Sequence, residues 1–495
     1  MDMSNIQLPP ASSHNPELRG RVLLVAGSDS SGGAGLEADQ KVLAAHGCYA
    51  MTATTALTAQ NTLGVDDIHH VPADFVKKQI DAVFKDIKPD VIKTGMLATA
   101  DIIGMVAKAF ADYNVNRLVL DPVMVATTGA QLLPSEAVND LRELLLPQTF
   151  IVTPNIPEAR RLLTVPGQEP PPEADGTVAQ TEDEKEVVYD VLVGGDSVTK
   201  IQAAYQKTKN THGTGCSLAS AVAANLSMGL DPVEAVKAAC AYVEAAIRFA
   251  PGYGEGNGPL NHFHSMHTLP FAPDRFVDYL LNRPDVAPVW HKFVNHPFVL
   301  AMGNGTLPEE SFKNYLIQDY LYLVHFARAN ALASYKAKNI KDIAAGAKIV
   351  THINTEMNLH IDYCASFGIS KEQIEATEEH QACTAYTRYV LDVGMSSDWL
   401  ALQVALAPCL LGYGAIGKAL YESRDTKREG NTYFKWIANY VAEDYVEAVK
   451  TGRELMERHA SGLNLGQVEE LVKVFIHGTK MEIGFWEMFP STTSA

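Results

Sequence analysis

The sequence predicts two domains: an N-terminal α/β domain with helices on both faces of a mostly parallel sheet, and a C-terminal all-α domain. Between residues 21 and 150, short apolar runs alternate with amphipathic stretches, and strands that alternate with helices form parallel sheets. After Pro273 the strand-like runs stop. Long segments rich in Ala, Leu, Tyr and His follow, with apolar residues recurring about every 3.6 residues.

The individual elements follow from these two patterns. The predicted strands are residues 21–26, 90–94, 117–121 and 149–153, and the clearest predicted helices are 73–86, 135–146, 309–333 and 398–421. We expect a disordered tail over 1–20, a first domain over 21–265, a linker over 266–275 and a second domain over 276–495. Residues 164–186 contain a run of prolines and an acidic cluster, which cannot build a packed core, so we expect a loop or a disordered segment there.

Composition excludes several classes of function. The net charge is −18 and no basic tract is present, so we expect no nucleic-acid partner, because duplex binding needs clustered Lys and Arg. The six cysteines are scattered without a Cys-x-x-Cys pair, which argues against structural zinc and a disulfide scaffold. The first residues do not resemble a secretory signal and no run of about 18 apolar residues occurs, so we expect a cytosolic protein without a membrane partner. Three histidines within 261–267 lack a neighbouring carboxylate or cysteine, and we expect no metal there.

Two glycine motifs lie at predicted helix starts in the first half. Residues 27–35 follow the first strand and open a helix, where glycines let backbone N–H groups approach an anion; simple strand-to-helix packing is the alternative. Residues 211–216 precede an Ala-rich helix, where Gly213, Thr214 and Gly215 can form an anion hole for a phosphoryl group. Cys216 falls in the first turn, where the helix dipole lowers a thiol pKa and favours a thiolate base; a buried small residue is the alternative.

Together these motifs closely resemble the hydroxymethylpyrimidine kinases, a branch of the ribokinase-like fold, over about residues 21–264. The resemblance rests on Gly27-Ser-Asp-Ser-Ser-Gly-Gly-Ala-Gly35, Thr58-Ala-Gln-Asn-Thr62, Lys93-Thr-Gly-Met96, Asp121-Pro-Val-Met124, Thr153-Pro-Asn-Ile-Pro-Glu158 and Thr211-His-Gly-Thr-Gly-Cys216. It implies phosphorylation of 4-amino-5-hydroxymethyl-2-methylpyrimidine and its monophosphate, with ATP and Mg²⁺. Sugar kinases of this fold carry Asp at the position of Cys216, so the cysteine favours the pyrimidine branch, with a pyridoxal-type kinase as the alternative.

The resemblance also assigns roles to individual residues. The residues expected to line the pyrimidine pocket are Gly27, Asp39, Gln60, Met96 and Val123. Those expected near the nucleotide are Asp121, Asn155 and Glu158, with Asp121 and Glu158 reaching Mg²⁺ indirectly. Residues 213–216 would hold the transferring phosphate, with Cys216 beside the substrate oxygen. Asp121 as a strand end and Asn155 as a helix N-cap are the structural alternatives.

The chain departs from the resemblance between Glu158 and Thr211. This interval is shorter than in the family, which places another helix and strand there, with a Lys-Gly-Gly-His motif at the strand end. Gly194-Gly195-Asp196 lacks that Lys and His and is predicted to lie in a later hairpin. We therefore expect a missing strand, a missing nucleotide-side lysine and an impaired kinase. A kinase half that only binds or serves as a scaffold is the alternative.

In the second half, polar residues share helix faces with aromatic residues. Cys409 lies four residues before Tyr413, and Asp319 lies three residues before Tyr322, so each pair occupies one face of a helix. Glu482 lies one turn before a Phe-Trp pair. Aromatic stripes at helical spacing are usually core, but a buried carboxylate on such a stripe is costly unless it is paired or used.

These residues resemble thiaminase II, an all-α haem-oxygenase-like fold, over about residues 276–489; we expect no haem. The motifs are His296-Pro-Phe298, Gly305-Thr-Leu307, Gln318-Asp-Tyr-Leu-Tyr322, Ala385-Tyr-Thr387, Pro408-Cys409, Tyr433-Phe-Lys-Trp-Ile-Ala-Asn-Tyr440 and Glu482-Ile-Gly-Phe-Trp486. The resemblance makes Cys409 the nucleophile, Glu482 the general acid/base and Asp319 a pyrimidine ligand that assists activation. The residues expected to stack on or hydrogen-bond the ring are Tyr322, Tyr386, Tyr413 and Tyr440.

The order of the two halves resembles a fungal-type fusion of hydroxymethylpyrimidine/phosphomethylpyrimidine kinase with thiaminase II. The implied second activity is hydrolysis of aminomethylpyrimidine or thiamine to hydroxymethylpyrimidine. The aminomethyl substrate is favoured because its product is what the first domain would phosphorylate. The expected partners are small-molecule pyrimidines and ATP, and both families imply a homo-oligomer.

Overall fold

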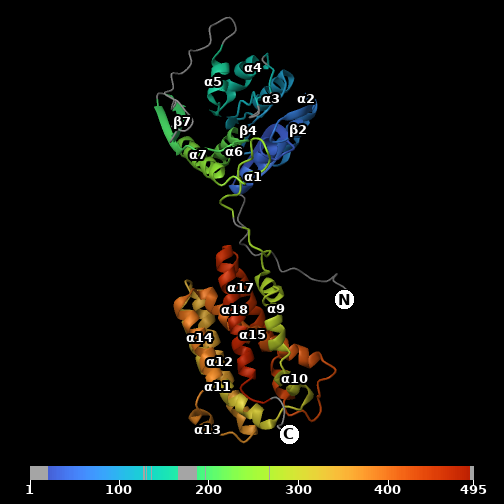
Figure 1. Ribbon diagram of the computed structural model, residues 1–495, viewed down its shortest axis with the longest axis vertical. Helices are drawn as coiled ribbons and strands as arrows, with labels where there is room; N and C mark the ends of the chain where they lie inside the picture. The colour runs from blue at the N-terminus through green and yellow to red at the C-terminus, as the bar shows by residue number, and fades with distance from the viewer. Residues whose placement is uncertain are drawn as a thin grey trace. The chain divides into compact units, whose positions relative to one another are not determined.

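The computed structural model describes residues 20–125, 129, 131–134, 136–164, 187–195, 197–266 and 268–490, apart from the side chains at 352, 355, 356, 358 and 359. Contacts divide the chain into two compact units, residues 1–266 and 267–495 (Figure 1). Residues 1–19 of the expected tail and 165–186 of the expected acidic segment lie outside the described residues.

The first unit is built around a six-stranded sheet with the order β3-β2-β1-β4-β5-β6. The strands are β1 Arg21–Asp29, β2 Tyr49–Gln60, β3 Val65–His70, β4 Val91–Thr94, β5 Leu118–Leu120 and β6 Ile151–Val152. All neighbours pair in parallel except β3, which pairs antiparallel with β2. The predicted α/β class is therefore confirmed. The expected strands 117–121 and 149–153 are shorter than predicted, and β2 and β3 were not foreseen.

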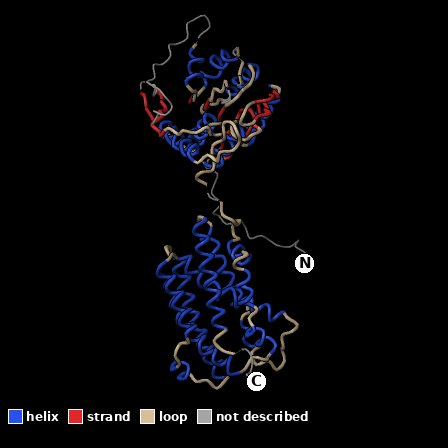
Figure 2. The backbone as a smooth tube through the Cα atoms, in the orientation of Figure 1, coloured by secondary structure: helices blue, strands red, loops and turns tan. Residues whose placement is uncertain are grey.

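Both faces of this sheet are covered by helices (Figure 2). One face carries α1 Gly35–Ala45, α6 Thr214–Ser227 and α7 Pro232–Arg248; the other carries α2 Ala73–Asp86, α3 Ala100–Asp112 and the short α4 Ala137–Asp140. Val22 and Leu24 of β1 join the first core, whereas Leu23 and Val25 join the second. This alternation follows from the strand period of two, and it makes β1 a fully buried central strand.

Other helical segments of this unit are short. The predicted helix 135–146 appears as α4, a π-helical turn over Leu141–Leu145 and a 3-10 turn over Leu146–Gln148. Helix α5 spans Ile156–Leu163 directly after β6.

A separate hairpin follows the acidic segment. Strands β7 Val187–Gly194 and β8 Ser197–Ala204 pair antiparallel in their own two-stranded sheet, which confirms the hairpin expected around Gly194. Leu192 and Ile201 pack against the core beneath α7. Within the described ranges, no strand pairs with the outer edge of β6.

The second unit contains helices and no strand among its described residues, as predicted. The helices are α8 Phe276–Asn282, α9 Ala287–Val294, α10 Pro297–Asn304, α11 Glu309–Lys336, α12 Ile340–Ser366, α13 Lys371–Ala376, α14 Gln381–Ser396, α15 Trp399–Glu422, α16 Phe434–Asn439, α17 Glu443–Ala460 and α18 Leu465–Trp486. Helix α15 packs against α9, α11, α14, α17 and α18, so it lies at the centre of this unit.

Helix α15 explains the most apolar stretch of the sequence. By length and composition it could cross a membrane, and it is the one such helix among the described residues. Yet 72% of its apolar window is buried inside the helical unit. Its apolar character is therefore accounted for by its central position in the core.

Candidate active sites

The two glycine motifs of the first unit touch each other backbone to backbone. Gly213 caps the N-terminus of α6 with a φ of +81°, and a Cβ placed on it would lie 1.9 Å from the carbonyl oxygen of Gly33. Gly35, with a φ of +57°, would place a Cβ 2.5 Å from the carbonyl oxygen of Gly27. Glycine is therefore required at both positions. The contact brings the loop after β1 against the helix N-terminus expected to hold the phosphate.

Three of the expected pyrimidine-binding residues lie together. A Cβ on Gly27 would lie 2.2 Å from the terminal methyl carbon of Met96, so the glycine leaves room for that side chain. Val123 packs on the small cluster that contains Met96. The hydroxyl of Thr55 donates a 2.6 Å hydrogen bond to the carbonyl oxygen of Met96 and fixes this segment. Gln60, at the end of β2, lies beside the Gly-rich loop through Ser30, which its backbone N–H contacts at 2.8 Å.

Asp39, which is expected to line the pyrimidine pocket, forms a buried ion pair. Its side chain is fully buried, and both carboxylate oxygens accept hydrogen bonds from Nζ of Lys93, at 3.0 and 2.9 Å. The hydroxyl of Ser220 donates a third bond of 2.7 Å. Asp39 therefore neutralises a buried lysine, and its expected place beside the pyrimidine stays a prediction. Although burial lowers it, the charge of Asp39 holds the pKa of Lys93 above its usual range.

Lys93 also approaches Asp121, one of the residues expected near the nucleotide. Its Nζ lies 3.6 Å from Oδ2 of Asp121, and that oxygen is buried without a hydrogen-bond partner among the described residues. Burial raises the pKa of Asp121 to about 6, against the lowering effect of Lys93. Sequence analysis did not single out Lys93, although a lysine inside a buried apolar strand is itself a signal of an ion pair.

Cys216 lies in the first turn of α6, as expected, but its pKa moves in the opposite direction. Burial raises the pKa of the thiol to about 12, and the nearby charge of Lys93 only partly offsets this. A hydrogen bond links the thiol to the carboxylate of Asp121. The expectation of a low-pKa thiolate is therefore wrong for the free protein, because desolvation outweighs the helix dipole.

Asn155 and Glu158 form a reciprocal cap at the start of α5. The backbone N–H of Glu158 donates to Oδ1 of Asn155 at 2.9 Å, and that of Asn155 donates to Oε2 of Glu158 at 3.0 Å. The N-cap alternative is therefore correct for Asn155. Burial raises the pKa of Glu158 to about 7, and the charge of Asp121 raises it as well. A carboxylate pair with one unpartnered buried oxygen suits a magnesium ion that is held mostly by phosphates.

The expected residues of the helical unit converge from four helices and from the residue that ends α16. Asp319 and Tyr322 lie on α11, Tyr386 on α14, Cys409 and Tyr413 on α15, Tyr440 at the end of α16 and Glu482 on α18. The hydroxyl of Tyr386 donates a 2.7 Å hydrogen bond to Oε1 of Glu482. The rings of Tyr322 and Tyr386 stack with centroids 5.0 Å apart, and Tyr413 lies 5.2 Å from Tyr440.

The electrostatics of this cluster favour a protonated acid. Glu482 is 1% exposed, and burial raises its pKa to about 8; the charge of Asp319 raises it too, and the bond from Tyr386 lowers it. Burial raises the pKa of Tyr322 well above its usual range, and the charge of Cys409 raises it further. At neutral pH the site therefore holds a neutral carboxylic acid near the cysteine, as general acid catalysis requires.

Three buried aromatic residues of this site were missed from the sequence. Tyr315, one turn before Asp319, is fully buried, and Trp436 and Trp486 flank Tyr413 with ring centroids 5.9 and 5.5 Å away. Trp436 also lies 4.5 Å from Tyr440. Trp436 belongs to an aromatic stripe at helical spacing over residues 433–440, which is visible in the sequence. Helical spacing alone, however, does not distinguish aromatic residues of a site from those of a core.

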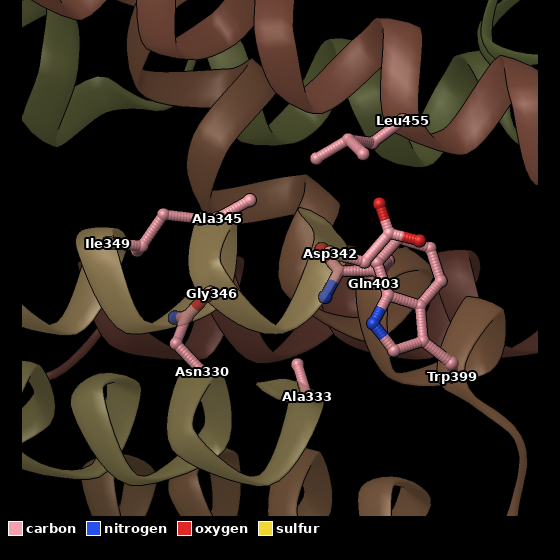
Figure 3. Close-up of a pocket in the computed structure, with 9 residues that line it drawn as sticks. All are labelled: Asn330, Ala333, Asp342, Ala345, Gly346, Ile349, Trp399, Gln403 and Leu455. Carbon is pink, nitrogen blue, oxygen red and sulfur yellow. The ribbon is translucent and has the colours of Figure 1, made fainter. Parts of the chain in front are cut away.

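A small hollow in the helical unit is lined by other residues (Figure 3). It is lined by Asn330, Ala333, Asp342, Ala345, Gly346, Ile349, Trp399, Gln403 and Leu455. Asp342 there is a helix-start residue, held by Asn339 and by Arg458 and His459 at 3.7 Å each. None of the expected catalytic residues lines this hollow. The contacts of Asp342 with the helix start and with Arg458 and His459 give its carboxylate a structural role.

Two family models match the chain. One, described as phosphomethylpyrimidine kinase, matches residues 29–261, and the other, described as the TENA/THI-4/PQQC family, matches residues 283–490. The two models cover the two compact units in turn.

Full-length relatives show the same pairing. The chain is 39% identical to putative hydroxymethylpyrimidine/phosphomethylpyrimidine kinase 2 of Schizosaccharomyces pombe, covering 94% of this chain and 90% of that one. It is 33% identical to hydroxymethylpyrimidine/phosphomethylpyrimidine kinase THI20 of Saccharomyces cerevisiae, covering 94% of each. A Bacillus subtilis kinase of the same name is 40% identical over 49% of this chain and 94% of its own length. The chain therefore belongs to the hydroxymethylpyrimidine/phosphomethylpyrimidine kinase family, in the form in which an ATP-using kinase domain and a TENA/THI-4 domain share one polypeptide.

Proposed function

We propose that the chain is a bifunctional enzyme of thiamine-pyrimidine biosynthesis and salvage. Its kinase unit phosphorylates 4-amino-5-hydroxymethyl-2-methylpyrimidine and its monophosphate, and its helical unit hydrolyses aminomethylpyrimidine or thiamine to the same hydroxymethylpyrimidine. The observation that carries the proposal is the buried, protonated Glu482, 2.7 Å from Tyr386 in the cluster that contains Cys409. Similarity to kinases named for this substrate, over 90% and 94% of their lengths, supports the first activity.

In the helical unit, Cys409 acts as the nucleophile and Glu482 as the general acid. The thiolate of Cys409 adds to the electron-poor pyrimidine once Glu482 protonates a ring nitrogen. The leaving group then departs as ammonia from an aminomethyl substrate, and water supplies the hydroxyl of the product while the thiolate is released. Asp319 binds the pyrimidine, and Tyr322, Tyr386, Tyr413 and Tyr440 enclose the ring. A pKa of about 8 leaves Glu482 mostly protonated at neutral pH, as this step requires.

In the kinase unit, positioning and charge neutralisation carry most of the catalysis. The backbone N–H groups of residues 213–215 hydrogen-bond the phosphoryl group while it passes from ATP to the substrate hydroxyl oxygen, and Asp121 and Glu158 would hold magnesium indirectly. Magnesium supplies positive charge that neutralises the phosphates of ATP. Because Cys216 keeps its proton in the free protein, we assign it as a hydrogen-bond partner of Asp121 next to the substrate oxygen, and not as a preformed base.

A kinase unit that only binds the pyrimidine is the second candidate. It is favoured by the outer edge of β6, which has no paired strand within the described ranges, and by the sequence Gly194-Gly195-Asp196, which lacks the Lys and His of a Lys-Gly-Gly-His motif and of which Gly194 ends strand β7 of the hairpin. A nucleotide-side lysine from that motif would be lost, whereas Gly27, Gln60, Met96 and Cys216 remain. A cytosolic, homo-oligomeric enzyme is part of the proposal, and sedimentation velocity of the full chain tests the assembly.

A substrate panel tests the two activities separately. The full chain with ATP and Mg²⁺ is given hydroxymethylpyrimidine or pyridoxal, and without ATP it is given aminomethylpyrimidine or thiamine. We expect phosphorylation of the pyrimidine in preference to pyridoxal, and release of hydroxymethylpyrimidine from the aminomethyl substrate faster than from thiamine. Preferential phosphorylation of pyridoxal would reassign the kinase unit. Failure to hydrolyse either pyrimidine would overturn the role of the helical unit.

A further inference from the structure

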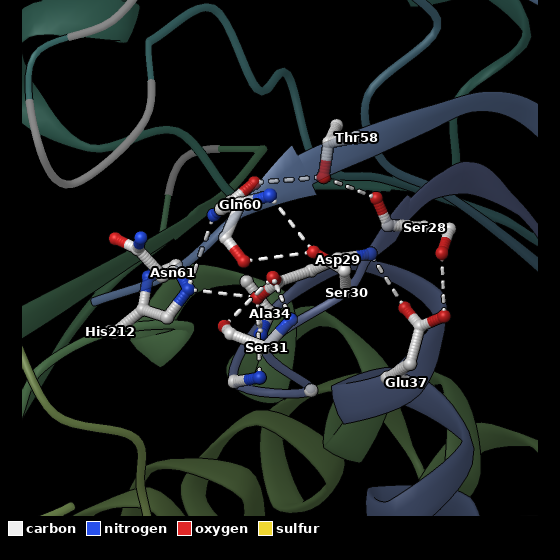
Figure 4. Close-up of polar contacts among 12 residues, drawn as sticks. Ser28, Asp29, Ser30, Ser31, Ala34, Glu37, Thr58, Gln60, Asn61 and His212 are labelled. Carbon is white, nitrogen blue, oxygen red and sulfur yellow. Dashed lines mark hydrogen bonds and ion pairs between the residues drawn. The ribbon is translucent and has the colours of Figure 1, made fainter. Parts of the chain in front are cut away.

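Two buried polar side chains connect the glycine motifs of the kinase unit, and neither belongs to the site residues considered so far. Asp29 ends β1 and is 2% exposed; His212 directly precedes Gly213 and is 3% exposed. Nε2 of His212 lies 2.8 Å from Oδ2 of Asp29 (Figure 4). The pair joins segments 183 residues apart, so it fixes how the loop after β1 meets the start of α6.

Asp29 organises the Gly-rich loop. Its carboxylate accepts hydrogen bonds from the backbone N–H groups of Ser31, Gly33 and Ala34, at 2.9, 3.2 and 2.8 Å, and from the hydroxyl of Ser31 at 2.8 Å. Although burial raises it, the hydrogen bonds from His212 and Ser31 hold the pKa of Asp29 below its usual range. An ionised, multiply bonded carboxylate of this kind is a rigid anchor, because each bond is charge-assisted.

His212 also contacts the side chain of Gln60. Its Nε2 also lies 3.3 Å from Nε2 of Gln60, whose Oε1 is 3.2 Å from the hydroxyl of Thr58 (Figure 4). The imidazole lies against the loop, since a Cβ on Gly33 would lie 2.5 Å from its Cδ2. Because Nε2 of His212 donates its proton to Asp29 and the Thr58 hydroxyl donates to the carbonyl oxygen of Ser28, the two contacts hold the amide when its oxygen faces His212 and its nitrogen donates to the Thr58 hydroxyl.

We propose that His212, anchored by Asp29, is a positioning residue that fixes the side chain of Gln60 for the pyrimidine. The inference rests on the proposed function, from which the contact between Gln60 and the pyrimidine comes. Without the imidazole, the side-chain amide of Gln60 keeps Thr58 as its one polar contact among the described residues and must be ordered by the ligand itself. Ordering one such side chain on binding weakens affinity by about threefold to tenfold.

The test measures ATP-dependent phosphorylation by the full chain with labelled ATP, a signal that the hydrolase unit does not produce. His212→Leu removes both ring nitrogens, and His212→Gln keeps an amide near the position of Nε2. Asp29→Asn keeps the shape of the anchor and removes its charge. The matched control is His262→Leu, a histidine that is also 3% exposed but bonds Ser217 at 3.1 Å, outside the Asp29–His212–Gln60 chain.

We expect His212→Leu to raise the KM for hydroxymethylpyrimidine about tenfold and that for ATP less than about twofold. His212→Gln should recover most of the loss, Asp29→Asn should show a smaller rise of the same kind, and His262→Leu should leave the ratio of the two KM values unchanged. Because His212 acts through Gln60, the double variant His212→Leu/Gln60→Ala should be no worse in pyrimidine KM than Gln60→Ala alone.

Two outcomes overturn the inference while the proposed function stands: an equal rise of both KM values in His212→Leu, or independent, multiplying effects of His212→Leu and Gln60→Ala. If His212→Leu does not fold, as judged by thermal melting, Asp29→Asn and His212→Gln decide the same questions. A wild-type chain that phosphorylates pyridoxal but not hydroxymethylpyrimidine overturns the proposed function first, and the inference with it.

Discussion

The hydroxyl of Tyr386 donates a 2.7 Å hydrogen bond to Oε1 of Glu482, and both side chains are almost fully buried. Burial raises the pKa of Glu482 to about 8, while this bond pulls it in the opposite direction. The tyrosine therefore tunes the acid towards neutral pH, where a general acid works best. The following predictions for the hydrolase depend on this pair.

Tyr386→Phe should move the descending limb of the hydrolase pH profile to higher pH. Removing the bond leaves the ionised form of Glu482 less stabilised, so its pKa rises above about 8. We expect the rate at neutral pH to fall by about tenfold, because the carboxylate that forms as Glu482 gives up its proton loses a charge-assisted hydrogen bond. The measurement is kcat between pH 6 and pH 10. If the descending limb of the pH profile does not move in Tyr386→Phe, Tyr386 does not set the pKa of Glu482.

Glu482→Gln should slow hydrolysis by about 10²–10⁴-fold, the usual range for a general acid/base. In the wild type, the rate should fall as pH rises through about 8, because only the protonated acid is active. The stability of the folded protein should depend on pH in the same direction. A buried acid with a raised pKa contributes fully to stability at low pH, and this contribution is lost as pH rises through about 8. The control is Glu487→Gln, an exposed carboxylate that pairs with Lys292 at 3.1 Å. A loss below about threefold in Glu482→Gln would make that carboxyl structural.

Cys409→Ala should abolish release of hydroxymethylpyrimidine and leave ATP-dependent phosphorylation unchanged. The cysteine lies in the second compact unit, and every kinase motif lies in the first. Cys383→Ala serves as a control, because this buried thiol donates to the carbonyl oxygen of Gln318 and has no assigned role. Both rates are measured on the same protein sample. Wild-type hydrolysis in Cys409→Ala would show that the nucleophile assignment is wrong.

Lys93→Met should destabilise the kinase unit by about 3–5 kcal/mol, because it leaves Asp39 buried without its partner. The double variant Lys93→Met/Asp39→Asn should recover most of this loss. Urea unfolding followed by circular dichroism reports the change. Trp290, Trp399, Trp436 and Trp486 all lie in the helical unit, so tryptophan fluorescence provides an internal control whose transition should not move. Equal stability of the single and double variants would contradict the ion-pair role.

The kinase should turn over more slowly than the Bacillus subtilis relative, while its pyrimidine KM stays comparable. Strand β6 has no neighbour on its outer edge among the described residues, and the sequence lacks a Lys-Gly-Gly-His motif, so we expect weaker stabilisation of the ATP phosphates. The residues expected at the pyrimidine are present in the sequence. Both enzymes are compared under one set of conditions, with Cys409→Ala in the full chain so that pyrimidine is not regenerated. Turnover equal to that of the relative, with micromolar ATP, would contradict the prediction.

The sequence predicted the parts of the fold that depend on local pattern. The short apolar run 21–26 corresponds to β1, and the amphipathic stretch 73–86 corresponds to α2. Strand β2, rich in Ala and Thr, and strand β3, rich in Asp and His, have no apolar run and were missed. They are strands because they pair with each other and with β1, which is a tertiary effect.

In the candidate sites, too, the features set by local sequence pattern could be predicted and those set by tertiary contacts could not. The cluster around Cys409 and Glu482 could be predicted because helical spacing and order carry it, although the individual roles stay predictions. The ion pair of Lys93 with Asp39 spans 54 residues, and the contact of His212 with Asp29 spans 183, so no local pattern reveals either. The pKa of Cys216 was predicted with the wrong sign because the helix dipole is local, whereas desolvation depends on the packed surroundings.

The most direct test of the account is a time course in which aminomethylpyrimidine is the only pyrimidine supplied to the full chain. Products are separated by chromatography and identified by mass, with and without ATP and Mg²⁺. We predict that hydroxymethylpyrimidine and ammonia appear in equal amounts without ATP, and that phosphorylated hydroxymethylpyrimidine appears, after a lag, only when ATP and Mg²⁺ are present. A mixture that forms no hydroxymethylpyrimidine, or that forms phosphorylated aminomethylpyrimidine directly, would contradict the claim that one chain carries these two consecutive reactions.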